Sequence, residues 1–130
     1  MSYPLYLLPD TYGLYKLEYP LEGWMSESDL LFALQEGQTL SVITKMGSAL
    51  KAKEQEEGWL VFQLKGPLPF SEPGLLFKIL SPLADAKISI LAYSTFDNDY
   101  ILFKKEHLEE ALSALKAKGI TVLTKIPHAK

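Results

Sequence analysis

The feature that most constrains the fold is the order of two hydrophobic periodicities between Gly58 and Thr124. Segments rich in bulky, β-favouring residues alternate there with segments whose leucines recur at helical spacing. Four segments are predicted strands: 59–64, 88–95, 100–103 and 120–123. Two are predicted helices, one from Ser71 to Leu83 and one from Glu106 to Lys118, which Gly119 ends.

This β-α-β-β-α-β order predicts an α+β fold on the ferredoxin-like plan, with two helices on one face of an antiparallel sheet. The turn-forming run 96–99 joins the second and third strands into a hairpin. Ser71 is the predicted N-cap of the first helix, and Phe70 is placed to pack onto Leu75. Pro82 lies late in that helix, where we expect it to kink or loosen the last turn.

The first half of the chain is less regular. Strands are predicted at 5–8, 12–19, 29–35, 39–45 and 48–53, with one helical turn at 24–28 and a solvated turn at the charged run 54–57. We expect residues 1–57 to form a degenerate version of the second lobe and residues 58–130 to form the ferredoxin-like domain. No flexible linker separates the two, so we expect them to pack as one unit.

The charge of the chain argues against a nucleic-acid partner. Its formal net charge is −3 at pH 7, whereas phosphates require a basic surface. All 13 cationic residues are lysines, so the chain lacks the planar arginine fork that grips phosphate or carboxylate at two points. The absence of cysteine excludes disulfides, thiol catalysis and thiolate metal sites.

The apolar runs are short. None approaches the ~20 residues that a membrane-spanning helix needs, and the first residues lack the pattern of a secretory signal. We therefore expect a cytoplasmic protein with no membrane partner.

The polar residues show no catalytic or metal-binding arrangement. His107 falls in the first turn of a helix and His128 in the tail, and neither has metal-ligand spacing with a carboxylate pair. The serines lack the context of an activated nucleophile. We expect no catalytic residues, no metal and no cofactor, and an enzyme is the last of our hypotheses.

A series of short motifs in the second half resembles the ACT domain family. The motifs are Ile79-Leu80-Ser81-Pro82-Leu83-Ala84-Asp85, then Ile88-Ser89-Ile90, then Ser94-Thr95-Phe96-Asp97-Asn98-Asp99-Tyr100-Ile101-Leu102. More narrowly, the series is similar to the tandem-ACT proteins related to CASTOR-type arginine sensors and to aspartokinase regulatory modules. The similarity covers residues 58–124, and residues 1–57 agree with it only in general organisation.

The resemblance implies ligand-responsive regulation without chemistry, with an amino acid as the ligand. Because the ligand lies between two lobes in such proteins and this chain supplies one of them, a homodimer is implied. The positions carried over as ligand-binding are Glu72, Gly74, Leu75, Lys78, Ile79, Thr95, Phe96 and Asp99. Lys78 departs from the small polar residue expected at its position; it either blocks a cationic ligand or binds an acidic group.

The same residues suit an α-amino acid on physical grounds. The start of the first helix offers free N–H groups and the positive end of a dipole to a carboxylate. Gly74 allows close approach to the backbone; Glu72 and Asp99 suit an ammonium group, and Phe96 suits an aliphatic stem. The alternative is purely structural: Ser71 and Gly74 start a helix, and Thr95 and Asp99 close a turn.

A second function remains open at this point. A domain with this fold that no longer binds a ligand would instead present its sheet edges or its tyrosine-rich N-terminal strands to another protein. The sequence identifies neither the ligand nor the partner.

Overall fold

Two structural units share the chain in the computed structural model, which describes residues 4–18, 23–24, 29–47, 49–67 and 74–124. Unit 1 combines Met1–Pro9 with Leu60–Lys130, and unit 2 is Asp10–Trp59. Strand β7 (Glu54–Leu64) contributes its first residues to unit 2 and its last residues to unit 1. Each unit is described below by itself.

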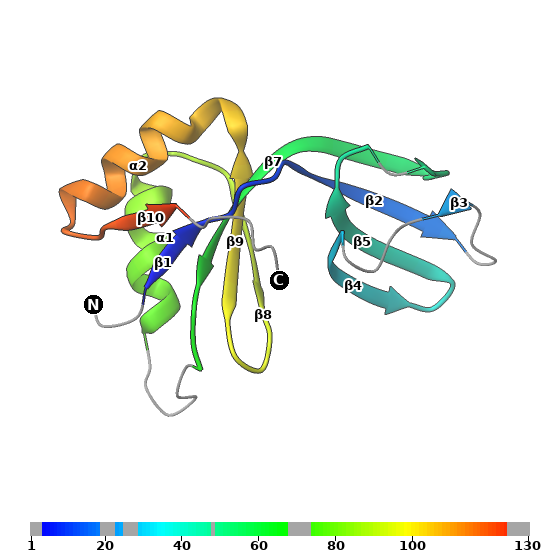
Figure 1. The fold of residues 1–130 in the computed structure, drawn as a ribbon, viewed down its shortest axis with the longest axis horizontal. Helices are drawn as coiled ribbons and strands as arrows, with labels where there is room; N and C mark the ends of the chain where they lie inside the picture. The colour runs from blue at the N-terminus through cyan, green and yellow to red at the C-terminus, as the bar shows by residue number, and fades with distance from the viewer. Residues whose placement is uncertain (1–3, 19–22, 25–28, 48, 68–73, 125–130) are drawn as a thin grey trace. The chain divides into compact units, whose positions relative to one another are not determined.

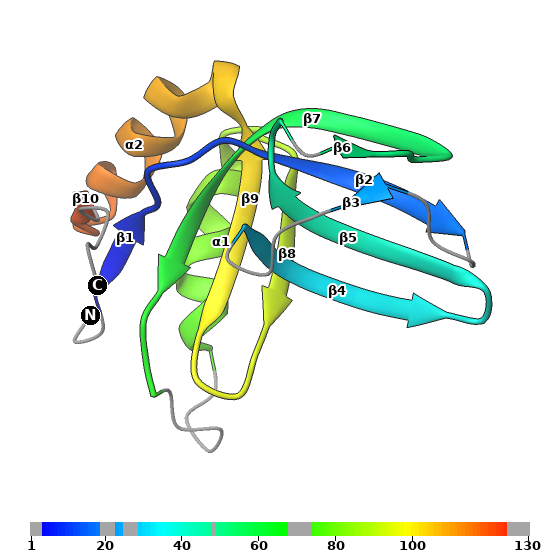
Figure 2. The same ribbon diagram turned by 45° about the vertical axis from the view of Figure 1, so that its right-hand side comes forward.

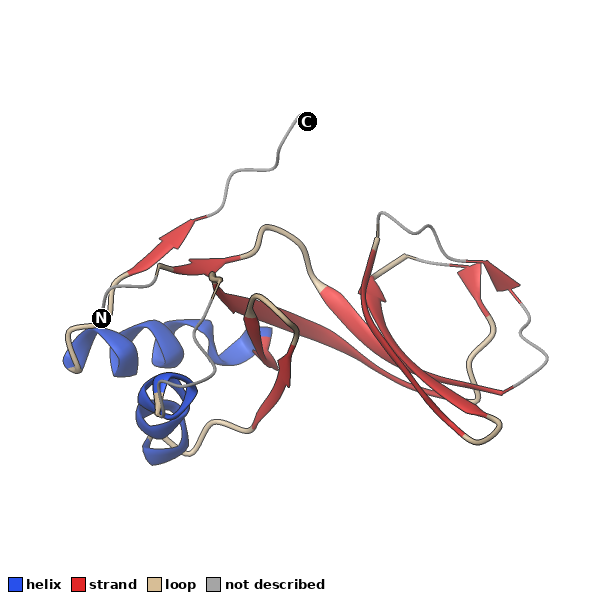
Figure 3. Cartoon of the chain, turned by 90° about the horizontal axis from the view of Figure 1, so that it is seen from below, coloured by secondary structure: helices blue, strands red, loops and turns tan. Residues whose placement is uncertain are grey.

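Unit 1 has the predicted α+β architecture. After β7 come α1 (Leu75–Asp85), β8 (Ile90–Ser94), β9 (Asp99–Lys104), a 3₁₀ turn η1 (Lys105–His107), α2 (Leu108–Ala117) and β10 (Val122–Thr124). The β-α-β-β-α-β order expected from the sequence is therefore confirmed. Both helices lie on the same face of the sheet (Figure 3), and β8 and β9 form the predicted hairpin.

A strand from the N-terminus completes this sheet. β1 (Leu5–Leu7) lies between the last and first strands of the ferredoxin-like plan (Figure 1). It pairs in parallel with β10, Leu5 opposite Val122, and antiparallel with β7, Leu5 opposite Leu64. The observed division falls between residues 59 and 60, two residues from the expected boundary at 57–58, and it places the first nine residues in unit 1.

The core of unit 1 fills the space between the helices and the sheet. The apolar stripe of α1 is buried there, including Ile79 and Leu83, which are fully enclosed. From the sheet, the rings of Phe62 and Phe103 stack with their centroids 4.6 Å apart. Pro82 lies inside α1, and the hydrogen bonding continues past it, since the Ala86 N–H donates to the Pro82 carbonyl at 3.1 Å.

In the described part of unit 2 the regular elements are all strands. They are β2 (Tyr12–Glu18), β3 (Gly23–Trp24), β4 (Leu30–Glu36), β5 (Thr39–Lys45), β6 (Ala49–Leu50) and the first residues of β7. The main sheet runs β7-β2-β5-β4, and β3 pairs with β6. The helical turn expected at 24–28 is not seen at Trp24, which lies in β3; residues 25–28 lie outside the described residues.

The turn predicted for residues 54–57 is wrong. These four residues are exposed, as their charge suggested, yet they form the start of β7 and pair with β2. An antiparallel ladder satisfies their backbone groups while the side chains face solvent.

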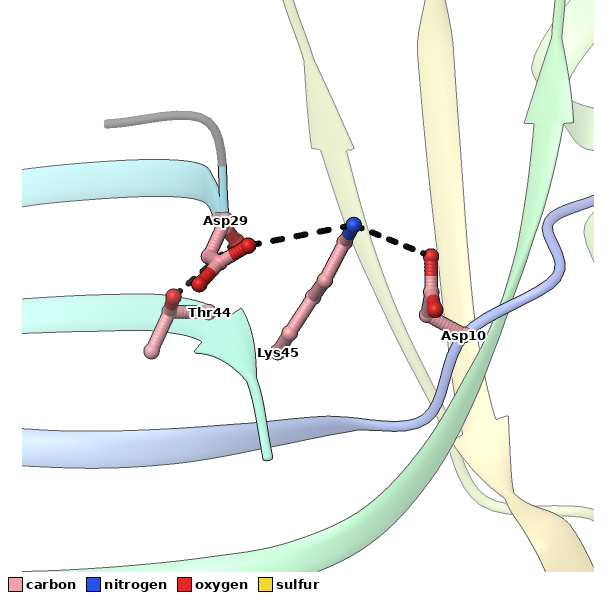
Figure 4. Close-up of polar contacts among 4 residues, drawn as sticks. All are labelled: Asp10, Asp29, Thr44 and Lys45. Atoms are coloured by element: carbon pink, nitrogen blue, oxygen red, sulfur yellow. Dashed lines mark hydrogen bonds and ion pairs between the residues drawn. The ribbon is translucent and has the colours of Figure 1, made fainter. Parts of the chain in front are cut away.

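Cross-strand pairs build the core of unit 2. Tyr15 lies opposite Val42 and Leu17 opposite Leu40, and all four side chains are buried. At the end of β5, the Lys45 ammonium lies between two carboxylates, 3.3 Å from Asp10 and 3.8 Å from Asp29 (Figure 4). These pairs are about two-fifths exposed, so each contributes at most about 1 kcal/mol.

A glycine makes room for the buried tyrosine of this unit. The Tyr15 hydroxyl donates to the Glu57 carboxylate at 2.6 Å, and Glu57 is the register partner of Gly13. A Cβ on Gly13 would come within 2.5 Å of the Tyr15 hydroxyl oxygen and 2.7 Å of its ring. The ring therefore occupies the space over Gly13 that a side chain would need.

We predict that Gly13→Ala lowers the free energy of unfolding by about 1–3 kcal/mol, because the Tyr15 ring must leave its place. Urea denaturation measures the change. In a Tyr15→Val background the same substitution should cost much less, since the clash is gone. Equal costs in the two backgrounds would contradict this explanation.

A pH prediction follows from the same tyrosine. Burial, then the hydrogen bond to Glu57 and the charge of that carboxylate, raise the pKa of Tyr15 well above its ordinary 10. Folding therefore favours the neutral phenol, and its stabilising effect is complete below pH 10 and is lost as the pH rises above it. We expect Tyr15→Phe to flatten the fall of unfolding free energy above about pH 10.

The matched variant is Glu57→Gln, which keeps an oxygen acceptor and removes the charge. Because burial is the largest cause of the shift, Glu57→Gln should keep most of the alkaline dependence. A wild-type profile that coincides with that of Tyr15→Phe would show that Tyr15 does not titrate in this way.

Candidate functional site

The candidate ligand-binding residues fall on two segments of unit 1. Gly74, Leu75, Lys78 and Ile79 belong to the start of α1, and Thr95, Phe96 and Asp99 belong to the β8–β9 hairpin. The N-terminal end of α1 and the turn of the hairpin lie at the same end of the unit (Figures 1 and 2). We call this part of unit 1 the ligand end. Glu72 lies outside the described residues.

A glycine stands at the start of α1. Gly74, rather than the predicted Ser71, takes the N-cap position, with φ 82° and no side-chain cap; Ser71 lies outside the described residues. A left-handed φ favours glycine because a Cβ would be strained there. Nothing in the described part of the chain lies within 4 Å of the place where a Gly74 Cβ would be, and Gly74 is exposed.

The electrostatics of this helix start favour an anion. The first N–H groups of a helix have no partner within it, and they form the positive end of its dipole. The first turn of α1 contains no acidic residue. The Lys78 N–H makes an early helical hydrogen bond, to the Gly74 carbonyl at 3.1 Å.

The four candidate residues at the start of α1 differ in how far they are exposed. Leu75 is 6% exposed and Ile79 is fully buried, so both side chains belong to the core of unit 1. Lys78 is exposed. It lines an open depression of about 370 Å³ together with Phe77, Ser81, Pro82, Lys118, Gly119 and Ile120. No hairpin residue lines that depression.

The hairpin turn is closed by its own side chains. The Asn98 N–H donates to the Thr95 hydroxyl at 3.1 Å, and that hydroxyl lies 3.2 Å from the Asn98 carbonyl, to which it donates. The Ser94 hydroxyl donates to one carboxylate oxygen of Asp99 at 2.6 Å. Thr95 and Asp99 therefore have the turn-closing role that was the structural alternative to ligand binding. Phe96 projects from the same turn with 80% of its surface exposed.

Three residues at this end were not singled out from the sequence. The Asn98 side chain accepts a hydrogen bond from the Gly66 N–H at 2.8 Å, and the buried Gln63 amide donates to the Tyr100 hydroxyl at 3.0 Å. Asn98 was interpreted only as a turn former. An amide residue in a strand that is otherwise apolar, such as Gln63, is the sequence signal that would have indicated a buried polar partner.

The described residues contain no group of three or more side chains that could hold a metal ion. His107, the last residue of η1, pairs with Glu110 in the first turn of α2 at 2.7 Å, and their side chains are 40% and 64% exposed. His128 lies outside the described residues. Neither described helix is long and apolar enough to cross a membrane.

Residues 54–117 match the sequence model of the ACT domain family, which confirms the resemblance to that family. Protein Atu0741 from Agobacterium tumefaciens is 25% identical, with a TM-score of 0.80 over 100% of this chain and 98% of that chain. No functionally curated protein matches the chain.

Two aspartokinase structures share the fold at lower identity. The aspartokinase alpha and beta subunits are 14% identical, with a TM-score of 0.62 over 90% of this chain and 98% of that one. The ligand-free regulatory subunit of aspartate kinase from Thermus thermophilus is 12% identical, with a TM-score of 0.58 over 87% and 95%.

The turn geometry makes a prediction. Thr95→Val removes both side-chain hydrogen bonds to Asn98 at nearly constant volume, so it should lower the free energy of unfolding by about 0.5–1.5 kcal/mol. Thr95→Ser keeps the hydroxyl and should cost less. Urea denaturation of both variants checks the order; if serine is as destabilising as valine, the hydroxyl does not hold the turn.

Proposed function

Since residues 54–117 of this chain are an ACT domain, we propose that the protein is a regulatory module that binds an amino acid and performs no chemistry itself. The observation that carries the proposal is the ligand end of unit 1. A helix start, which favours an anion, and a hairpin turn with a carboxylate and an exposed ring lie there at the same end of one domain. An α-amino acid carries an anion, a cation and an apolar stem close together.

The carboxylate of the ligand is assigned to the start of α1. The first N–H groups of the helix, which begin at the exposed Gly74, attract a negative charge. The positive charge of Lys78, one turn into the helix, adds to this attraction, so an acidic group on the ligand is favoured over a cationic one.

The ammonium group and the stem are assigned to the hairpin. Asp99 uses one carboxylate oxygen to accept from Ser94, and its charge remains to attract an ammonium group. The exposed ring of Phe96 would cover an aliphatic stem. Glu72 is kept in the proposed site as a second acidic residue. Leu75 and Ile79, which are buried, support the proposed site from the core of unit 1.

The proposed assembly is a homodimer in the cytoplasm, with no nucleic-acid or membrane partner. One chain supplies one complete ACT domain, so a second copy would provide the facing lobe. The degenerate ACT-like lobe expected at residues 1–57 stays a proposal, for the part of that range that lies in unit 2. The regulated protein would respond to the liganded state.

The test is the melting temperature of the chain in the presence of each of the twenty amino acids. A ligand at 100 times its Kd stabilises the folded state by about 2.7 kcal/mol, which raises the melting temperature by several degrees. Asp99→Asn keeps the acceptor for Ser94 and removes the charge, so it should reduce the shift. Asp97→Asn, the same change two residues away on an exposed side chain, should leave it intact.

Light scattering on the same samples measures the oligomeric state. A folded protein whose melting temperature responds to none of the amino acids would refute the ligand-binding proposal. It would favour the second function, an ACT domain that binds another protein, for which the exposed Phe96 is the first residue to substitute.

A further inference from the structure

Four polar groups connect the end of β7 to the β8–β9 turn. Gln63, the residue before the last of β7, is 5% exposed, and it is one of only two buried polar residues in the described part of the chain. Its side-chain amide donates to the Tyr100 hydroxyl at 3.0 Å. A buried amide without a partner is costly, so this hydrogen bond fixes where the hydroxyl lies.

The Tyr100 hydroxyl leads in turn to Asn98. The Nδ2 atom of Asn98 lies 3.5 Å from that hydroxyl, and its Oδ1 atom accepts from the Gly66 N–H at 2.8 Å. The two ends of one amide group therefore face different partners. Tyr100 receives the donor end, which leaves the acceptor end toward the backbone that follows β7.

Asn98 also belongs to the turn through its backbone. Its N–H and carbonyl both bond to Thr95, and neither bond uses its side chain. Asn98 is thus the one described residue whose backbone closes the turn while its side chain holds Gly66. Gly66 in turn precedes the segment that leads to α1.

We infer that Asn98 is a positioning residue that fixes the hairpin turn relative to the end of β7, and that Tyr100 and Gln63 orient its amide. This inference rests on the proposed function, because it concerns the two segments of the ligand end. The carboxylate of Asp99 and the start of α1 must keep a fixed separation to hold the two charges of one small molecule. The amide of Asn98 holds the turn at the end of β7 before the ligand arrives, and β7 shares its core with Leu75 of α1. A site ordered in advance binds more tightly.

The first experiment measures amide hydrogen exchange by NMR on the full chain without ligand. Asn98→Ala spares the backbone bonds of the turn and removes the acceptor, so exchange at Gly66 should accelerate roughly threefold to tenfold. Asn98→Asp keeps an oxygen acceptor and should restore the protection. Asp97→Ala, one residue earlier on an exposed side chain, is the control and should leave Gly66 unchanged.

Tyr100→Phe tests the orienting role. It should accelerate exchange at Gly66 by a smaller factor than Asn98→Ala, because the acceptor remains but is less well held. Unchanged exchange at Gly66 in Asn98→Ala, in a variant as stable as the wild type, would overturn the inference whatever the chain binds.

The second experiment titrates the amino acids of the panel into the same variants by calorimetry. Asn98→Ala and Tyr100→Phe should raise the Kd of a binding amino acid by up to about tenfold. Asp97→Ala should leave the Kd unchanged. Unchanged affinity alongside faster exchange at Gly66 would overturn the positioning role. If no amino acid binds while Gly66 responds, the proposed function fails and the connection between the turn and β7 stands.

Discussion

The backbone ladder on both sides of β1 is the interaction on which unit 1 depends. Among the described strands, β10 is joined to the sheet only through β1, and β1 is joined to β7 by the antiparallel pairs that begin at Leu5 and Leu64. The Leu5 side chain is 1% exposed and lies in the same core as both helices. The three residues of β1 therefore connect the end of the domain to its beginning, and the helices pack on the sheet that results.

Much of this fold was predictable from signals within a few residues of sequence. The pairing of strands that are far apart in the sequence was not. The periodicity of α1, the stop at Gly119 and the turn between β8 and β9 are encoded within a few residues of each other. The place of β1 depends on partners far along the chain, and a short apolar segment does not indicate them. The charged residues 54–57 were misinterpreted because an edge strand needs only its backbone to be paired, and its side chains can all be polar.

The candidate site shows the same contrast between local signals, which were predictable, and contacts with distant residues, which were not. The resemblance carried Leu75 and Ile79 over as ligand-binding positions, and the structure places both side chains in the core. For Thr95, the sequence allowed a turn-closing role and a ligand-binding role, and the structure shows the first while leaving the second as a proposal. The contact of Asn98 with Gly66 was not predictable, because the turn propensity of asparagine explains its presence in the hairpin without requiring a partner outside it.

The insertion of β1 also sets an order of assembly. The chain is synthesised from its N-terminus, so β1 is made first, yet its partners are not present until residues 64 and 122 have been made. All of unit 2 is made in between, and the pairings of β2, β4 and β5 lie within it. The pairings within unit 2 can therefore form before those of β1, and β10 completes the sheet that contains β1.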